Sequence, residues 1–128
     1  MSAANEMNLL ADRLTRAYEH NDMDAIAACY DPDARIWHNF DGAEQTVEEQ
    51  LSVTRWLNER LKNIRYEIVS RHSFQGGYVQ QHVVHGTIAN GGDAFRMPAC
   101  MNVTMRAGRI VRVEEYLDSA HLAPLQTA

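Results

Sequence analysis

A single carboxylate stands among apolar side chains near the end of the chain, in the segment from Arg109 to Asp118. Alternate residues of a strand share a face, and one face of this segment carries Val111, Val113, Glu115 and Leu117. Burying an unpaired charge is costly, so a lone carboxylate on a buried face indicates a functional site. In apolar surroundings its pKa is expected to rise, which would make Glu115 an effective base.

Histidines on two other predicted strands could share a proton with this carboxylate, because an imidazole titrates near neutral pH. His82 and His85 lie on opposite faces of one predicted strand. His38 lies on the face opposite Trp37 and Asn39 in another. Periodicity alone does not decide which of these residues point inward.

Methionines dominate one face of the strand predicted over residues 95–106, which carries Met97, Ala99, Met101, Val103 and Met105. This face must be buried, and two interpretations of it stay open. The methionines could simply fill the core, or they could form an adaptable wall for an apolar ligand, since the Met side chain is flexible.

The composition predicts one globular domain spanning residues 1–128, with its core in about 5–120. With 45% hydrophobic and 23% charged residues, the chain is neither disordered nor membranous. A net charge of −5 disfavours nucleic acid and anionic lipid as partners. The N-terminus has no signal-peptide pattern, so a cytoplasmic protein is expected, with Cys29 and Cys100 as buried free thiols. Neither metal-ligand spacing nor a glycine-rich phosphate loop occurs, so no metal or other cofactor is predicted.

Hydrophobic spacing predicts helices first and strands afterwards. The predicted helices cover residues 5–20, a short segment that ends near residue 30, and residues 47–62, where Thr46 and Glu49 form a capping box. A turn is predicted at 31–33, strands at 34–39, 66–74, 78–89, 95–106 and 109–118, and a loosely held tail at 121–128. Glycines between the last four strands predict hairpins, hence a largely antiparallel sheet in an α+β domain.

Three segments resemble one known superfamily. The segments Asp22–Ile26 and Tyr30–Ala34 are similar to the opening of proteins with the ketosteroid isomerase-like, or nuclear transport factor 2-like, fold. The stretch from Gly108 through Asp118 resembles the last strand of the SnoaL-like and limonene epoxide hydrolase-like branches. The resemblance implies a cone-shaped, curved sheet wrapped around N-terminal helices, a cystatin-like α+β barrel. It also implies a homodimer formed through the outer face of the sheet, where Tyr116, Ile110 and Val83 would offer apolar area.

The limonene epoxide hydrolase branch can be compared residue by residue. Its water-holding Tyr-x-Asn falls on Trp37–Asn39, so Asn39 matches and tryptophan replaces the tyrosine. Its Arg-x-Asp, in which the aspartate is the general acid, falls on His82–Val84. Histidine therefore replaces the arginine, and valine replaces the acid. Its general base falls on Glu115. The comparison therefore implies that His82, Trp37 and Asn39 point inward.

A second comparison, with the ketosteroid isomerases, puts their catalytic aspartate near His38, which makes that residue a further catalytic candidate. We therefore expect a pocket for a small apolar or carbonyl-containing molecule, with Glu115 as base, His82 as donor and Asn39 beside them. Trp37, Tyr18, Met97, Met101, Val84 and Leu117 would form its ligand-binding wall.

The sequence leaves four interpretations of the pocket open: two kinds of enzyme, a binding site without catalysis, and a purely structural pair. An enzyme of the isomerase or polyketide cyclase type needs only one base and one polarising donor. An epoxide hydrolase would need a proton donor where valine stands at position 84. The pocket could also bind a ligand without catalysis, or His82 and Glu115 could be a buried pair that only organises the core.

Overall fold

The N-terminal helices begin where the sequence offers polar caps. In the computed structural model, which describes residues 2–126, α1 (Ala3–Glu19) starts after Ser2, whose hydroxyl accepts the N–H of Asn5. The short helix α2 (Met23–Ala28) is capped by Asp22. The buried residues of α1 recur at helical spacing and face the core: Leu10, Ala11, Leu14 and Ala17.

The third helix, α3 (Val47–Arg60), begins with the predicted capping box. The hydroxyl of Thr46 accepts the N–H of Glu49, and the Glu49 carboxylate accepts the N–H of Thr46. Each bond satisfies a backbone donor that the first helical turn would otherwise leave without a partner. The helix ends at Arg60 and the chain turns directly into a strand.

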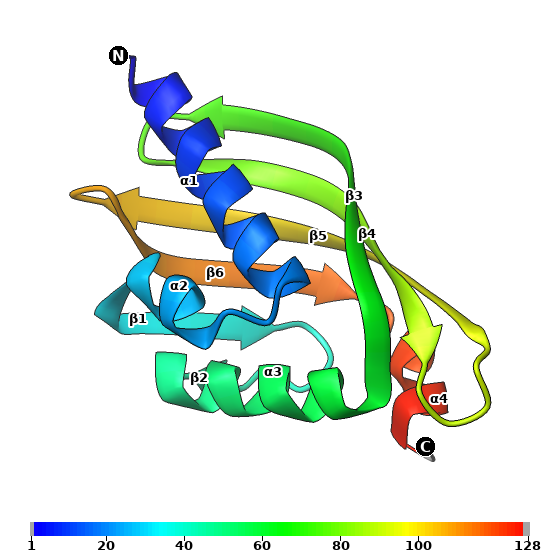
Figure 1. Cartoon of the computed structure of the whole chain (residues 1–128). Coiled ribbons are helices and arrows are strands. Elements are labelled where there is room, and N and C mark those ends of the chain that lie inside the picture. Colours follow the sequence, from blue (N-terminus) through cyan, green and yellow to red (C-terminus); the bar gives the residue numbers. More distant parts are fainter. Residues whose placement is uncertain (1, 127–128) are drawn as a thin grey trace.

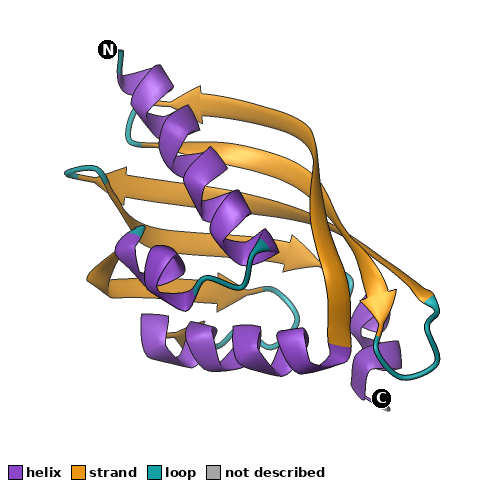
Figure 2. Ribbon diagram, in the orientation of Figure 1, coloured by secondary structure: helices purple, strands orange, loops and turns teal. Residues whose placement is uncertain are grey.

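Six strands form one curved sheet in the order β2-β1-β6-β5-β4-β3 (Figures 1 and 2). Their bounds are β1 Tyr30–His38, β2 Glu44–Gln45, β3 Leu61–Phe74, β4 Gly77–Ile88, β5 Ala94–Arg106 and β6 Arg109–Leu117. The predicted hairpins are confirmed, because β3, β4, β5 and β6 pair antiparallel in sequence order. Among the strand pairs within residues 2–126, the pairing of β1 with β6 is the only parallel one, so the sheet is mixed.

The concave side of the sheet is covered by helices. Figure 1 shows α1 crossing the curved sheet, with α2 and α3 beside β1, and the contacts agree: α1 packs on β3, and α2 and α3 pack on β1. The predicted α+β architecture, a curved sheet wrapped around N-terminal helices, is therefore confirmed.

Three boundaries differ from the predictions. β3 starts at Leu61, earlier than the predicted residue 66, because α3 ends without an intervening loop. β1 starts at Tyr30 and takes in residues 31–33, which were predicted to form a turn; its register with β6 shifts between Tyr30 and Arg35 instead. The two-residue strand β2 was not predicted, since so short a segment carries no period.

A β-bulge in β6 changes which residues face the core at the start of that strand. Val113 pairs with Val103, whereas Ile110 pairs with Met105, so one extra residue is accommodated between them. Ile110 is consequently fully buried in the core. The prediction that Ile110 lies on the outer face is therefore wrong, because strict alternation does not hold across a bulge.

The described part of the C-terminal tail is packed. A 3₁₀ turn (Ser119–Leu122) leads into α4 (Ala123–Gln126), and Leu125 is fully buried with Leu61 and Phe95. The prediction of a loosely held tail is thus wrong up to residue 126, and residues 127–128 lie outside the described part. Figure 1 shows α4 beside the turn between β4 and β5.

Two further features of the described chain can be compared with the predictions: membrane-spanning helices and the state of the cysteines. Within residues 2–126, no helix is long and apolar enough to cross a membrane. Both cysteines are free; Cys29 is buried, but Cys100 is only half-buried. Cys100 differs from the prediction because it pairs with Tyr116 on the outer, uncovered side of the sheet.

Candidate functional site

A cavity of about 260 Å³ lies between the concave face of the sheet and the helices. One part of its wall is polar and carries Tyr18, Tyr30, His38, Gln50, His82 and Glu115. Another part is apolar and carries Trp56, Leu57, Leu61, Ile64, Phe95 and Leu122. The cavity thus suits a small molecule that is polar on one side and apolar on the other.

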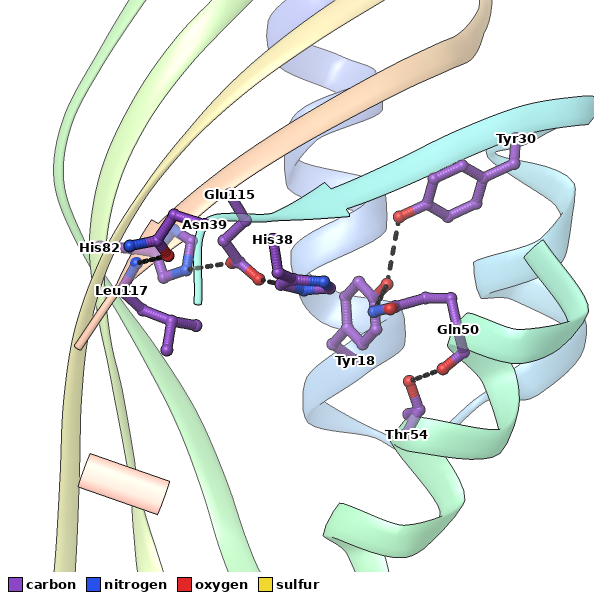
Figure 3. A network of polar contacts seen from close by, with 9 residues as sticks. All are labelled: Tyr18, Tyr30, His38, Asn39, Gln50, Thr54, His82, Glu115 and Leu117. Atoms are coloured by element: carbon purple, nitrogen blue, oxygen red, sulfur yellow. Dashed lines mark hydrogen bonds and ion pairs between the residues drawn. The ribbon is translucent and has the colours of Figure 1, made fainter. Parts of the chain in front are cut away.

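Glu115 stands between two histidines in the polar part (Figure 3). Its Oε1 lies 3.1 Å from Nε2 of His38, within hydrogen-bonding distance. Its Oε2 lies 3.8 Å from Nε2 of His82, which is too long for a direct hydrogen bond. The His82 nitrogen and the carboxylate therefore face each other without a direct hydrogen bond, and a ligand atom beside them in the cavity could contact both.

The strand pairing explains why His38 reaches the carboxylate. In the parallel ladder of β1 and β6, His38 is the direct partner of Glu115, and residues paired in this way share a face of the sheet. The inward orientation that the resemblance implied for Trp37 and Asn39 is wrong. The Trp37 ring packs edge-on against Tyr116 at 5.3 Å, outside the cavity wall.

Asn39 has a structural contact in place of the predicted water site. The residue is exposed, and its Oδ1 accepts the backbone N–H of Leu117 at 2.9 Å, next to the point where β1 ends (Figure 3). This bond ties the end of β1 to β6 beyond their regular ladder, so it helps to hold His38 opposite Glu115.

The two histidines have opposite tendencies to become charged. Burial lowers the pKa of His38, but the hydrogen bond and the negative charge of Glu115 outweigh this, so the pKa of His38 rises above its usual value. Burial also lowers the pKa of His82, and there the charge of Arg71 adds to the effect, while Glu115 opposes it only in part. His38 is thus the histidine that tends to be cationic, and His82 the one that tends to be neutral.

The pKa of Glu115 differs from the prediction. Burial raises it, as expected, but the hydrogen bond and charge of His38, together with the charge of His82, lower it below its usual value. The alternation of residues along β6 indicates an apolar face, but it does not reveal the histidine that β1 places next to Glu115. Glu115 is therefore ionised at neutral pH and able to accept a proton.

A chain of side chains behind His82 leads to the surface. Nδ1 of His82 lies 3.0 Å from Nε2 of Gln80, and Oε1 of Gln80 accepts the Nε–H of Arg71 at 2.8 Å. Arg71 then pairs with Asp12 on α1 at 2.8 Å. Gln80 was not predicted as a site residue. It lies two residues before His82 on the same strand, so the period of two already places both side chains on one face.

A second polar cluster lies on the other side of His38 (Figure 3), and of its members only Tyr18 was predicted to line the pocket. The hydroxyls of Tyr18 and Tyr30 are 3.1 Å apart, and Nε2 of Gln50 donates to the Tyr18 hydroxyl at 3.3 Å. Oε1 of Gln50 is buried without a hydrogen-bond partner among the described residues. A ligand hydroxyl or amide could satisfy this oxygen, since buried polar atoms are rarely left unpaired.

The other residues that were predicted to form the wall border this cavity. The cavity wall includes Tyr18, Val84, Met97, Met101 and Leu117. Their contact with a ligand stays a prediction. Among residues 2–126, no group of three His, Cys, Asp or Glu side chains is placed to hold a metal ion.

Comparisons with known proteins agree with this architecture. A protein from Catenulispora acidiphila with a ketosteroid isomerase-like fold, solved with trimethylamine, is 18% identical, with 89% of each chain covered and a TM-score of 0.76. IdmH of Streptomyces antibioticus, a proposed polyketide cyclase, is 17% identical over 94% of this chain and 98% of IdmH, with a TM-score of 0.81. An NTF2-like protein of unknown function from Burkholderia pseudomallei is 19% identical over the full length of both chains, also with a TM-score of 0.81.

The similarity to solved structures thus supports the fold, and sequence comparison identifies the family. No curated protein matches the chain significantly. The family model described as "SnoaL-like domain" matches residues 11–113, which is most of the chain. The protein therefore belongs to the SnoaL-like domain family and has the ketosteroid isomerase-like, or NTF2-like, fold.

Proposed function

We propose that the protein is an enzyme that moves a proton on a small carbonyl-containing molecule, in an isomerase-like or polyketide cyclase-like reaction. Membership of the SnoaL-like family and the likeness to IdmH, a proposed polyketide cyclase, support this reaction class. The observation that carries the proposal is one ionised carboxylate placed between two histidines of opposite charge tendency.

Each residue has a distinct role in this reaction. Glu115 takes a proton from the carbon next to the substrate carbonyl, and the Nε2–H of His82 donates a hydrogen bond to the carbonyl oxygen, where negative charge develops. Returning the proton to a different carbon completes an isomerisation. In a cyclisation, the carbon that lost its proton attacks a second carbonyl carbon, whose oxygen then receives the proton. His38 orients the carboxylate throughout.

The cavity limits the size of the substrate. An apolar cavity of about 150 Å³ is enough for benzene, and the cavity here measures about 260 Å³. A monocyclic or small bicyclic molecule fits this space. Its carbonyl would lie beside Glu115 and its hydrocarbon part would contact Leu61, Phe95 and Met97.

Proton abstraction can be tested before the natural substrate is known. A panel of small cyclic ketones is incubated with the protein in D₂O, and deuterium uptake next to the carbonyl is followed by NMR. We expect uptake with the native protein and about 10²–10⁴-fold less with Glu115→Gln, the usual contribution of a general base. Glu67→Gln, at an exposed glutamate that pairs with a histidine on the outer face, is the matched control and should keep the native rate.

Two outcomes would overturn the proposal. Full exchange activity in Glu115→Gln would show that this carboxylate is not the base. A native protein that binds ketones in the cavity and releases them without deuterium would be a binding module instead. Epoxide hydrolysis has less support, because Val84 in the cavity wall cannot protonate the departing oxygen.

We also propose that two chains associate through the outer face of the sheet. Of the three residues named for this face, only Tyr116 is exposed, at 50%; Val83 is 5% exposed and Ile110 lies inside. On β6 and β1, the apolar contact would therefore come from Tyr116 and the neighbouring Trp37. Sedimentation analysis of Tyr116→Asp should show a monomer where the native chain is a dimer, and a native monomer would refute this.

A further inference from the structure

The tautomer of His82 can be assigned from the residues behind it. The Nε–H of Arg71 is always a donor, so the Gln80 atom that it contacts at 2.8 Å must be the carbonyl oxygen. The other end of the Gln80 side chain is then the NH₂ group, which faces Nδ1 of His82 at 3.0 Å. Because NH₂ can only donate, Nδ1 of His82 must accept, and the single proton of the neutral ring is on Nε2.

We propose that Gln80, itself held by Arg71, is a positioning residue that keeps His82 as the uncharged tautomer with its proton on Nε2. A proton on Nδ1 would point at the NH₂ group of Gln80. Gln80 cannot reverse its amide to relieve this conflict, because its NH₂ group would then face the Nε–H of Arg71. Arg71 is in turn anchored by Asp12 on α1.

The surroundings of His82 support the same assignment. Glu115 on β6 is the only carboxylate that the structure places against its ring, at 3.8 Å, and it favours the charged form. Burial and the positive charge of Arg71 on β3 oppose protonation. The Tyr66 ring on β3, at 5.2 Å between ring centres, adds no charge at neutral pH because burial raises its pKa. The direct neighbour on β5 is Ala99.

This assignment determines what His82 can do in the cavity. A neutral imidazole that donates from Nε2 stabilises a developing oxyanion without first losing or gaining a proton. The site would therefore work as one anionic base and one neutral donor, not as a base and a cationic acid. The catalytic consequence rests on the proposed function, whereas the tautomer can be measured on the protein alone.

The experiment is ¹⁵N NMR of the protein labelled at histidine nitrogens, recorded across a pH series. We expect His82 to carry its proton on Nε2 in the native protein and to stay neutral at a pH where His38 is already charged. At high pH, where every imidazole is neutral, Arg71→Met should give a mixture of both tautomers at His82, because Gln80 is then free to reverse. Gln80→Glu should favour the proton on Nδ1, since a carboxylate accepts it.

Controls separate this effect from simple loss of charge. Removing a positive charge changes the pH at which His82 titrates, but it does not select the nitrogen that keeps the proton in the neutral ring. Arg65→Met, at an exposed arginine of the same strand whose partner His85 lies on the outer face, should leave the tautomer unchanged. A native His82 with its proton on Nδ1 overturns the proposal, as does an unaltered tautomer in folded Arg71→Met. Neither result depends on turnover, so a failure of the proposed reaction would be recognised separately.

Discussion

The pairing of His38 with Glu115 predicts a coupling free energy that depends on pH. The two atoms are 3.1 Å apart, and the side chains are only 10% and 19% exposed. Hydrogen bonds to charged groups contribute about 1.5–3 kcal/mol. Because the pair is buried, water and ions screen its charges less than they screen a surface pair. A double-mutant cycle of His38→Phe and Glu115→Leu should therefore give about 1.5–3 kcal/mol in mild acid.

The sign of the pH dependence follows from the pKa shifts. The pKa of His38 is higher in the folded protein than in the unfolded chain, so the charged pair contributes fully below the unfolded pKa. This contribution is lost as the pH rises through the folded pKa. Glu115 has a lowered pKa and stays ionised across this window. The coupling should thus be larger at about pH 5.5 than at about pH 9.

Urea unfolding of the four variants at each pH measures the coupling. The outer-face pair of His85 and Glu67, 2.8 Å apart but with Glu67 half exposed, provides a matched second cycle. Its coupling should be smaller and should fall with added salt, because water and ions screen exposed charges. The reasoning is refuted if the coupling between His38 and Glu115 is absent at acid pH, or if it grows as the pH rises.

Two further substitutions test the packing around the cavity. Leu125→Ala should lower the free energy of unfolding by about 2–5 kcal/mol, since Leu125 is fully buried. The control Leu9→Ala, at a 47% exposed position, should change it little. Equal effects of the two substitutions in urea titrations would contradict the packing of the tail. Gly86→Ala should cost about 1–3 kcal/mol, because its Cβ would lie 2.8 Å from the Leu61 side chain and 3.0 Å from the Lys62 carbonyl oxygen. A melting temperature unchanged from that of the native protein would refute this close approach.

Local signals in the sequence were sufficient for much of the fold. The capping box at Thr46 and the glycines between the last strands act within a few residues, so they predicted the start of α3 and the hairpins correctly. Glu115 was also placed on the inner face by simple alternation, because the bulge in β6 lies before Val113 and leaves the rest of the strand in phase.

The errors came from interactions between segments distant in sequence. Whether His38 or Trp37 faces inward depends on how β1 pairs with β6, and that ladder is parallel and joins segments more than 70 residues apart. The burial of Leu125 depends on Leu61 and Phe95, which no pattern in the tail reveals. The lowered pKa of Glu115 has the same origin, since its main partner is on another strand.

The cavity helps to decide whether His38, Glu115 and His82 have a purely structural role in the core. Closing such a space with apolar side chains would bury more apolar surface, and each buried CH₂ group contributes about 0.8 kcal/mol. A few such groups would be a useful gain for a small domain, whose total stability is about 5–15 kcal/mol. A His38–Glu115–His82 cluster that only organised the core would be better enclosed by packed side chains than left lining a space. Retaining both the space and the cluster favours a ligand as the missing partner of these groups.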